Sequence, residues 1–91
     1  MTAAYLQRLS VLNDELVELY SQRPVVTRAY YDGRAAQIRQ GVEHGLSVTA
    51  ARENADALTT TLRYEVDRLE ADILMRVEER DHLRFLIDHL T

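Results

Sequence analysis

The chain has 91 residues, of which 46% are hydrophobic and 29% are charged, with a formal net charge of −4 and no cysteine. This length fits one small domain, which buries only about two thirds of the surface that its unfolded chain exposes, so we expect self-association. The absence of cysteine excludes disulfides, thiolate metal sites and cysteine nucleophiles. A duplex-DNA binder usually carries a basic surplus, and the acidic balance here makes nucleic acid an unexpected partner.

The composition favours an all-α fold. The chain contains one proline, three glycines and no tryptophan, and its abundance of Leu, Ala, Glu and Arg is typical of helical and coiled-coil proteins. All eleven basic residues are arginine, which is typical of a GC-rich bacterial or phage genome. Without a secretory leader pattern or an apolar run of membrane-spanning length, we expect a cytoplasmic location and no membrane partner.

The first predicted helix covers residues 2–22. Its leucines recur at alternating steps of three and four, with a tyrosine one step before them, which is the pattern of a coiled-coil seam. We expect this seam to form an oligomer interface, and its residues are Tyr5, Leu9, Leu12, Leu16 and Leu19. Pro24 ends or kinks the helix, because proline lacks the backbone donor.

Two further helices are predicted, over residues 24–44 and 48–90. The second of these contains neither Gly nor Pro, and its apolar stripe, to which Leu62, Leu69 and Ile73 belong, is also expected at an oligomer interface. The predicted fold is therefore one domain, residues 1–91, in which two shorter helices joined near Pro24 pack on one long C-terminal helix as an antiparallel hairpin or bundle. A bend at Pro24 gives a hairpin, whereas a reversal leaves half of the long helix uncovered. Both alternatives favour a homodimer or a higher homo-oligomer.

Residues 27–41, TRAYYDGRAAQIRQG, combine three arginines with two adjacent tyrosines. On a helix, Arg28 and Arg39 share a face flanked by Tyr31, whereas Arg34 lies more than about 100° away. The arginines could pair with the acid-rich third helix. Alternatively, copies of the chain could combine all four side chains around a phosphate-bearing ligand, with Tyr stacking on a base and Arg holding phosphate.

Arg76 and Arg80 interrupt the apolar stripe of the third helix, where leucine or isoleucine is expected. One interpretation is a polar layer in which they meet Glu15 or Glu18, or acids of another subunit, and so fix the register of the helices. The alternative is that both arginines line a cavity for an anionic ligand.

Two other patterns resemble known sites. Glu79 and His82 have the Glu-x-x-His step of di-iron bundles, but they lie beside the apolar stripe, so we expect a solvated charged face and neither a metal nor a cofactor. Residues 41–54, GVEHGLSVTAAREN, have the rhythm of a helix-turn-helix. Their continuation is a long acidic helix, which does not suit reading of DNA.

The segment TLRYEVDRLEADILMRVEERDHL, residues 61–83, resembles the first helix of the all-helical chorismate mutases. The resemblance covers a quarter of the chain and places Arg63 and Arg80 where that family has two substrate-binding arginines. It implies a mutase-like enzyme as a further alternative. The family also has a lysine further along this helix, and this chain contains none.

No nucleophile, base and orienting residue can be grouped on one predicted helix face, so we assign no catalytic residue. We expect a non-enzymatic helical protein that homo-oligomerises and acts by binding another, unidentified protein or by assembly. The alternative is a protein that binds or sequesters a small anionic ligand, such as a nucleotide or cyclic nucleotide, at a subunit interface.

Overall fold

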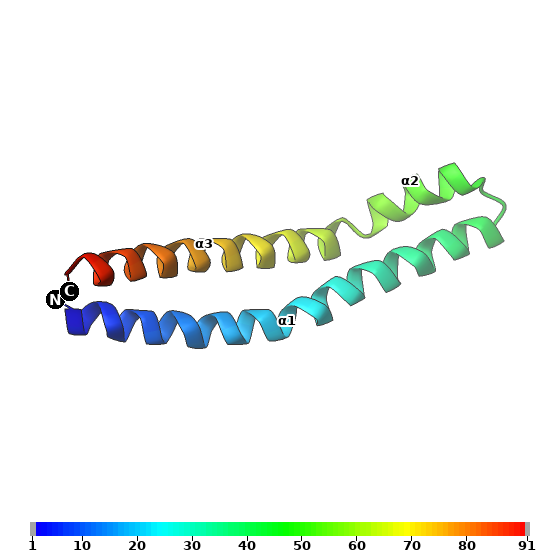
Figure 1. Ribbon diagram of the computed structural model, residues 1–91. Helices are drawn as coiled ribbons and strands as arrows, with labels where there is room; N and C mark the ends of the chain where they lie inside the picture. The colour runs from blue at the N-terminus through cyan, green and yellow to red at the C-terminus, as the bar shows by residue number, and fades with distance from the viewer. Residues whose placement is uncertain (1, 91) are drawn as a thin grey trace.

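A computed structural model describes residues 2–90, which form three α-helices and no strand: α1 (Thr2–Glu43), α2 (Val48–Leu58) and α3 (Thr60–Leu90). Figure 1 shows α1 running antiparallel to α2 and α3, so that the N-terminal end of α1 and the C-terminal end of α3 lie side by side. The predicted all-α class is confirmed, and α1 packs on α3. The hairpin measures 66 × 18 × 14 Å.

The first helix differs from the prediction at Pro24. Two shorter helices were expected on either side of this residue, whereas α1 is one continuous helix of 42 residues with Pro24 inside it. Proline removes one backbone hydrogen bond and its ring crowds the carbonyl one turn earlier, which bends a helix that tertiary packing holds on both sides. Figure 1 shows this bend in the light-blue to cyan part of α1, and the chain does not reverse there.

The long C-terminal helix also differs from the prediction, because it is interrupted at Thr59. The Thr59 hydroxyl donates a hydrogen bond to the Ala55 carbonyl at 2.7 Å, and the Thr60 hydroxyl donates to the Asp56 carbonyl at 3.1 Å. Threonine hydroxyls that bind carbonyls one turn back compete with the backbone ladder and bend helices. The break therefore arises without the Gly or Pro on which the sequence prediction relied.

The turn between α1 and α2 is closed by Gly45, the one described residue with a positive φ, at 93°. Its amide donates to the Val42 carbonyl and the next amide, that of Leu46, donates to the Gly41 carbonyl, at 3.0 and 2.9 Å. This is the pattern with which a left-handed glycine ends a helix. Ser47 then caps the N-terminus of α2, where its side chain accepts a hydrogen bond from the Ala50 amide.

The core is a single seam between α1 and the two helices that face it. At the open end of the hairpin, Leu16, Leu69 and Ile73 form its central cluster. At the turn end the side chains are smaller, and a Cβ placed on Gly41 would lie 3.0 Å from the Cβ of Ala51. One layer of side chains thus holds the hairpin together, and both outer faces of the seam stay open to solvent.

Candidate functional site

The residues predicted at an oligomer interface lie instead in the seam of a single chain. Leu12, Leu16, Leu69 and Ile73 are buried there without any second copy. The other four are half-buried, and they are Tyr5, Leu9, Leu19 and Leu62. A second chain would therefore meet a different set of side chains.

That different set begins with a stripe along the outside of α1. The stripe consists of exposed large side chains with 42–71% of their surface accessible, namely Leu6, Val17, Tyr20, Tyr31 and Val42. Leu6 and Val17 are eleven residues apart, and so are Tyr20 and Tyr31. Eleven residues make three helical turns with a drift of only about 20°, so these side chains follow one line along the helix.

A second line of exposed apolar side chains runs along α3. Leu74 and Phe85, with 58% and 56% exposure, are also eleven residues apart, and Arg63 precedes Leu74 by the same interval. Arg63 lines one cleft together with Tyr31 of the α1 stripe. The two lines therefore border the same side of the hairpin. We call this side the apolar face and define it by the side chains of the two lines that lie outside the cleft, namely Leu6, Val17, Tyr20, Val42, Leu74 and Phe85.

The overall dimensions of the chain leave this face uncovered. The accessible surface is 6616 Å², whereas a compact monomer of this mass exposes about 5,400 Å². The radius of gyration is 19.9 Å, against roughly 12 Å for a globular domain of equal length. Exposed large apolar side chains aligned on one side of a protein of this shape indicate an interaction site.

The second candidate site is a cleft of about 390 Å³ on the same side, where α1 passes from α3 to α2. Its lining comes from all three helices: Thr27, Tyr30, Tyr31 and Arg34 of α1, Asp56 of α2, and Arg63, Val66 and Asp67 of α3. The rings of Tyr30 and Tyr31 meet edge to face, with centroids 5.2 Å apart. The position of the cleft depends on the break before α3, which brings α2 and α3 together at this point.

The charges in the cleft are partly paired. Arg34 donates from Nε to Oδ1 of Asp56 at 2.7 Å. This hydrogen bond holds the pKa of Asp56 below its usual value and raises the pKa of Arg34, and the nearby charge of Arg63 lowers the pKa of Asp56 further. The guanidinium of Arg63 donates no hydrogen bond to another residue in the range 2–90. The cleft therefore offers arginine N–H donors that the chain itself does not use.

The structure brings together only part of the predicted arginine and tyrosine cluster. Tyr31 and Arg34 share the cleft, whereas Arg28 is exposed and pairs with Asp32 of its own helix at 3.5 Å. Arg39 is exposed and does not line the cleft. Sequence reasoning about this cluster missed Tyr30, Asp56 and Arg63, because the last two lie on helices whose register the sequence did not define.

Arg63 and Arg80, the pair indicated by the chorismate mutase resemblance, are not neighbours within one chain. Both lie on α3, and seventeen positions on one helix correspond to roughly 25 Å. Arg80 pairs with Asp81 beside it at 3.3 Å, while Arg63 lines the cleft.

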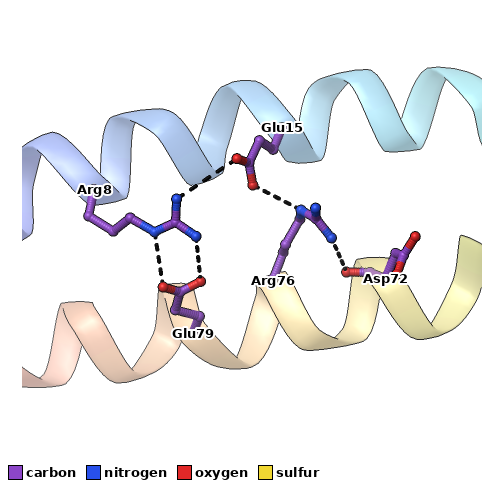
Figure 2. A network of polar contacts seen from close by, with 5 residues as sticks. All are labelled: Arg8, Glu15, Asp72, Arg76 and Glu79. Atoms are coloured by element: carbon purple, nitrogen blue, oxygen red, sulfur yellow. Dashed lines mark hydrogen bonds and ion pairs between the residues drawn. The ribbon is translucent and has the colours of Figure 1, made fainter.

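A network of ion pairs joins α1 to α3 near the open end of the hairpin, as Figure 2 shows. Arg8 donates to both carboxylate oxygens of Glu79 at 3.0 Å, and Arg76 donates to Glu15 at 2.9 Å. Arg8 also lies 3.8 Å from Glu15, which links the two pairs. The predicted pairing of Arg76 with Glu15 is confirmed, whereas Arg80 has its partner on its own helix. The network explains a polar position in the seam without any ligand.

Within residues 2–90, no group of three or more His, Asp or Glu side chains is arranged to hold a metal ion. Glu79 of the Glu-x-x-His step is the hydrogen-bond partner of Arg8.

None of the described helices is both long enough and apolar enough to cross a membrane.

No protein-family model matches the chain, and no similar curated protein or solved structure was found. The apolar face and the cleft are therefore the two candidate functional sites of the chain.

Proposed function

We propose that the protein is a non-enzymatic assembly module, a helical hairpin that homo-oligomerises through its apolar face and acts by protein–protein interaction. The observation that carries this proposal is the alignment of six exposed large apolar side chains on one side of a hairpin that has a single-layer core. The composition of the chain further suggests that the module works in the cytoplasm of a bacterium or of a phage-infected cell.

The dimensions of the face fit a stable interface. A side of 66 × 18 Å is larger than the about 800 Å² per partner that standard interfaces bury. Two hairpins packed through such faces give a four-helix bundle, the usual way in which paired helices cover a second apolar stripe. The six side chains would then become the core of the bundle rather than a solvated surface.

One part of the face lies beside the buried core cluster. Leu16 and Ile73 belong to one buried cluster, and the residues that follow them, Val17 and Leu74, are 71% and 58% exposed. Val17 and Leu74 therefore lie at the same level of the hairpin on its apolar side. Charges at these two positions would interrupt the face beside the core cluster while they leave the seam intact.

The test is the mass in solution of the wild-type protein and of the double variant Val17→Glu/Leu74→Glu, measured by light scattering after size exclusion. We expect at least twice the chain mass of 10.5 kDa for the wild type and the monomer mass for the variant. The matched control is Val25→Glu/Met75→Glu, because both residues are 68% exposed and neither belongs to the apolar face. Circular dichroism must show unchanged helix content in all three proteins. A wild-type protein that stays monomeric, or a double variant that assembles like the wild type, would refute the proposal.

A further inference from the structure

The cleft between Tyr31 and Arg63 combines three chemical features that the assembly proposal does not use. The first is cationic. Arg34 donates a hydrogen bond to Asp56 from its Nε–H group only. The Arg63 guanidinium has no hydrogen-bond partner in the described part of the chain. A guanidinium group presents a planar fork of donors that matches the oxygens of a phosphate group. Two such groups, one from α1 and one from α3, therefore border the same cleft.

The second feature is an open aromatic surface. Tyr31 is 63% exposed, and the ring of Tyr30 meets it at an interplanar angle of 62°. An edge contact of this kind fixes one ring against the other and leaves a face of the Tyr31 ring available. Stacking of a planar ring on an exposed tyrosine is a common way to hold a nucleobase.

The third feature is a pair of carboxylates, Asp56 and Asp67, which also line the cleft. They balance the two arginines, so the empty cleft carries no net charge. Asp56 occupies the Nε of Arg34, and the remaining carboxylate oxygens can accept hydrogen bonds from hydroxyl groups. A ligand that offers hydroxyls as well as an anion therefore suits this lining better than a bare anion does.

We propose that this cleft binds a small phosphorylated ligand with a planar ring and hydroxyl groups, of the chemical class of nucleoside monophosphates. The arginines hold the phosphate, Tyr31 stacks on the ring, and the two carboxylates accept hydrogen bonds from the sugar hydroxyls. The volume of about 390 Å³ lies in the range of roughly 300–1,000 Å³ typical of small-molecule sites. All the lining residues come from one chain, so binding does not require assembly.

The test is calorimetric titration of the full chain with adenosine monophosphate, adenosine and inorganic phosphate. We expect adenosine monophosphate to bind at least about tenfold more tightly than either of its parts, because only the intact molecule engages the arginines and Tyr31 together. Equal binding of phosphate and of adenosine monophosphate would overturn the role of the ring. Absence of any binding up to about millimolar concentration, the weak limit for a specific ligand, would overturn the whole proposal.

Variants then locate the site. Arg63→Gln should weaken binding at least about tenfold, and because this guanidinium makes no hydrogen bond in the described chain, its loss should have little effect on folding. Arg39→Gln is the matched control, since Arg39 is exposed and lies outside the cleft. Equal affinity of wild type and Arg63→Gln would contradict this placement of the phosphate.

The same titration on Val17→Glu/Leu74→Glu separates this inference from the assembly proposal. We expect this variant to bind adenosine monophosphate with the affinity of the wild type, because neither residue lines the cleft. If the wild type is monomeric and binds the ligand, the assembly proposal fails alone. If the variant is monomeric and folded but has lost binding, the cleft does not function within one chain and this inference fails alone.

Discussion

Leu12 is the largest side chain in residues 2–90 that is fully buried, with no exposed surface. Truncation of a buried leucine removes apolar contacts and leaves a cavity, which costs about 2–5 kcal/mol. We expect Leu12→Ala to fall near the lower limit, about 2 kcal/mol, because a single-layer seam can close over the gap more easily than a thick core can. Urea denaturation monitored by circular dichroism measures the change. Val25→Ala, at a 68% exposed site outside the seam, is the control and should shift stability by less than about 0.5 kcal/mol.

The interhelical carboxylates give the fold a defined response to acid. Hydrogen bonds from Arg8 and Arg23 hold the pKa values of Glu79 and Glu70 below their usual value of 4.5. Since the folded state favours the charged carboxylates, their stabilisation is present above pH 4.5 and is lost as the pH falls through the lowered pKa values. We therefore expect the melting temperature to fall between about pH 5 and about pH 3.

Thermal melts at low salt check this response, and the effect should be small because these ion pairs are partly solvated. The control is Glu70→Gln/Glu79→Gln, which removes both carboxylates and should flatten the dependence of the melting temperature on pH. A wild-type melting temperature that rises in acid would contradict the assignment.

Individual residue pairings were only partly predictable from the sequence. Arg76 interrupts an apolar stripe, so the sequence could indicate that it needs a carboxylate and could name Glu15 as a candidate. The pairs Arg8–Glu79 and Arg34–Asp56 depend on which turn of α1 lies opposite which turn of α3 or α2. That register is set by the turn at Gly45 and by the break at Thr59, and the sequence analysis did not anticipate the break.

At the scale of elements, the helix type and the ends of the two arms of the hairpin were predictable, whereas the continuity at Pro24 and the interruption at Thr59 were not. Alternating steps of three and four between leucines define an apolar face whatever lies between them, which explains why the all-α class was predicted correctly. Pro24 and Thr59 reverse the usual expectations, since the proline lies within a continuous helix and a threonine ends one. Both outcomes depend on packing and on side-chain hydrogen bonds that a residue-by-residue preference does not contain.

The glycines of α1 give a test of helix packing. A Cβ on Gly41 would lie 3.0 Å from Cβ and 3.3 Å from Cα of Ala51, which is part of the α2 backbone. A Cβ on Gly33 would meet only the terminal Cδ1 of Leu62, at 3.0 Å. We expect Gly41→Ala to lower the free energy of unfolding by about 1–3 kcal/mol, because α1 and α2 must separate.

Gly33→Ala is the matched variant, and it should change stability by less than about 1 kcal/mol, because the helix preference of alanine offsets a small movement of Leu62. Chemical denaturation of both variants at one protein concentration gives the comparison. Equal losses at the two positions would mean that α1 and α2 are not packed as closely as these distances indicate.

At the scale of the whole molecule, the sequence indicated that the chain should self-associate but not which surface it should use. The spacing of the leucines is the same whether the helix packs on another chain or on a later helix of the same chain. In the structure, the seam lies between α1 and α3 of one chain. The apolar face was not recognised because its eleven-residue spacing runs from Leu6 to Val42 across Pro24, where the helix was expected to end or bend.

If assembly covers the apolar face, folding and association are coupled, and stability depends on protein concentration. A partner that binds only the folded chain stabilises it by mass action, so the wild-type melting temperature should rise between about 1 and about 100 µM chain. Val17→Glu/Leu74→Glu should melt at a temperature independent of concentration, and at a lower value than the wild type at the upper end of this range. Val25→Glu/Met75→Glu should retain the wild-type slope, because those residues lie outside the face. Since aggregation would also depend on concentration, reversibility on cooling has to accompany the measurement. A flat wild-type profile with full reversibility would show that the hairpin is stable alone with its apolar face in water.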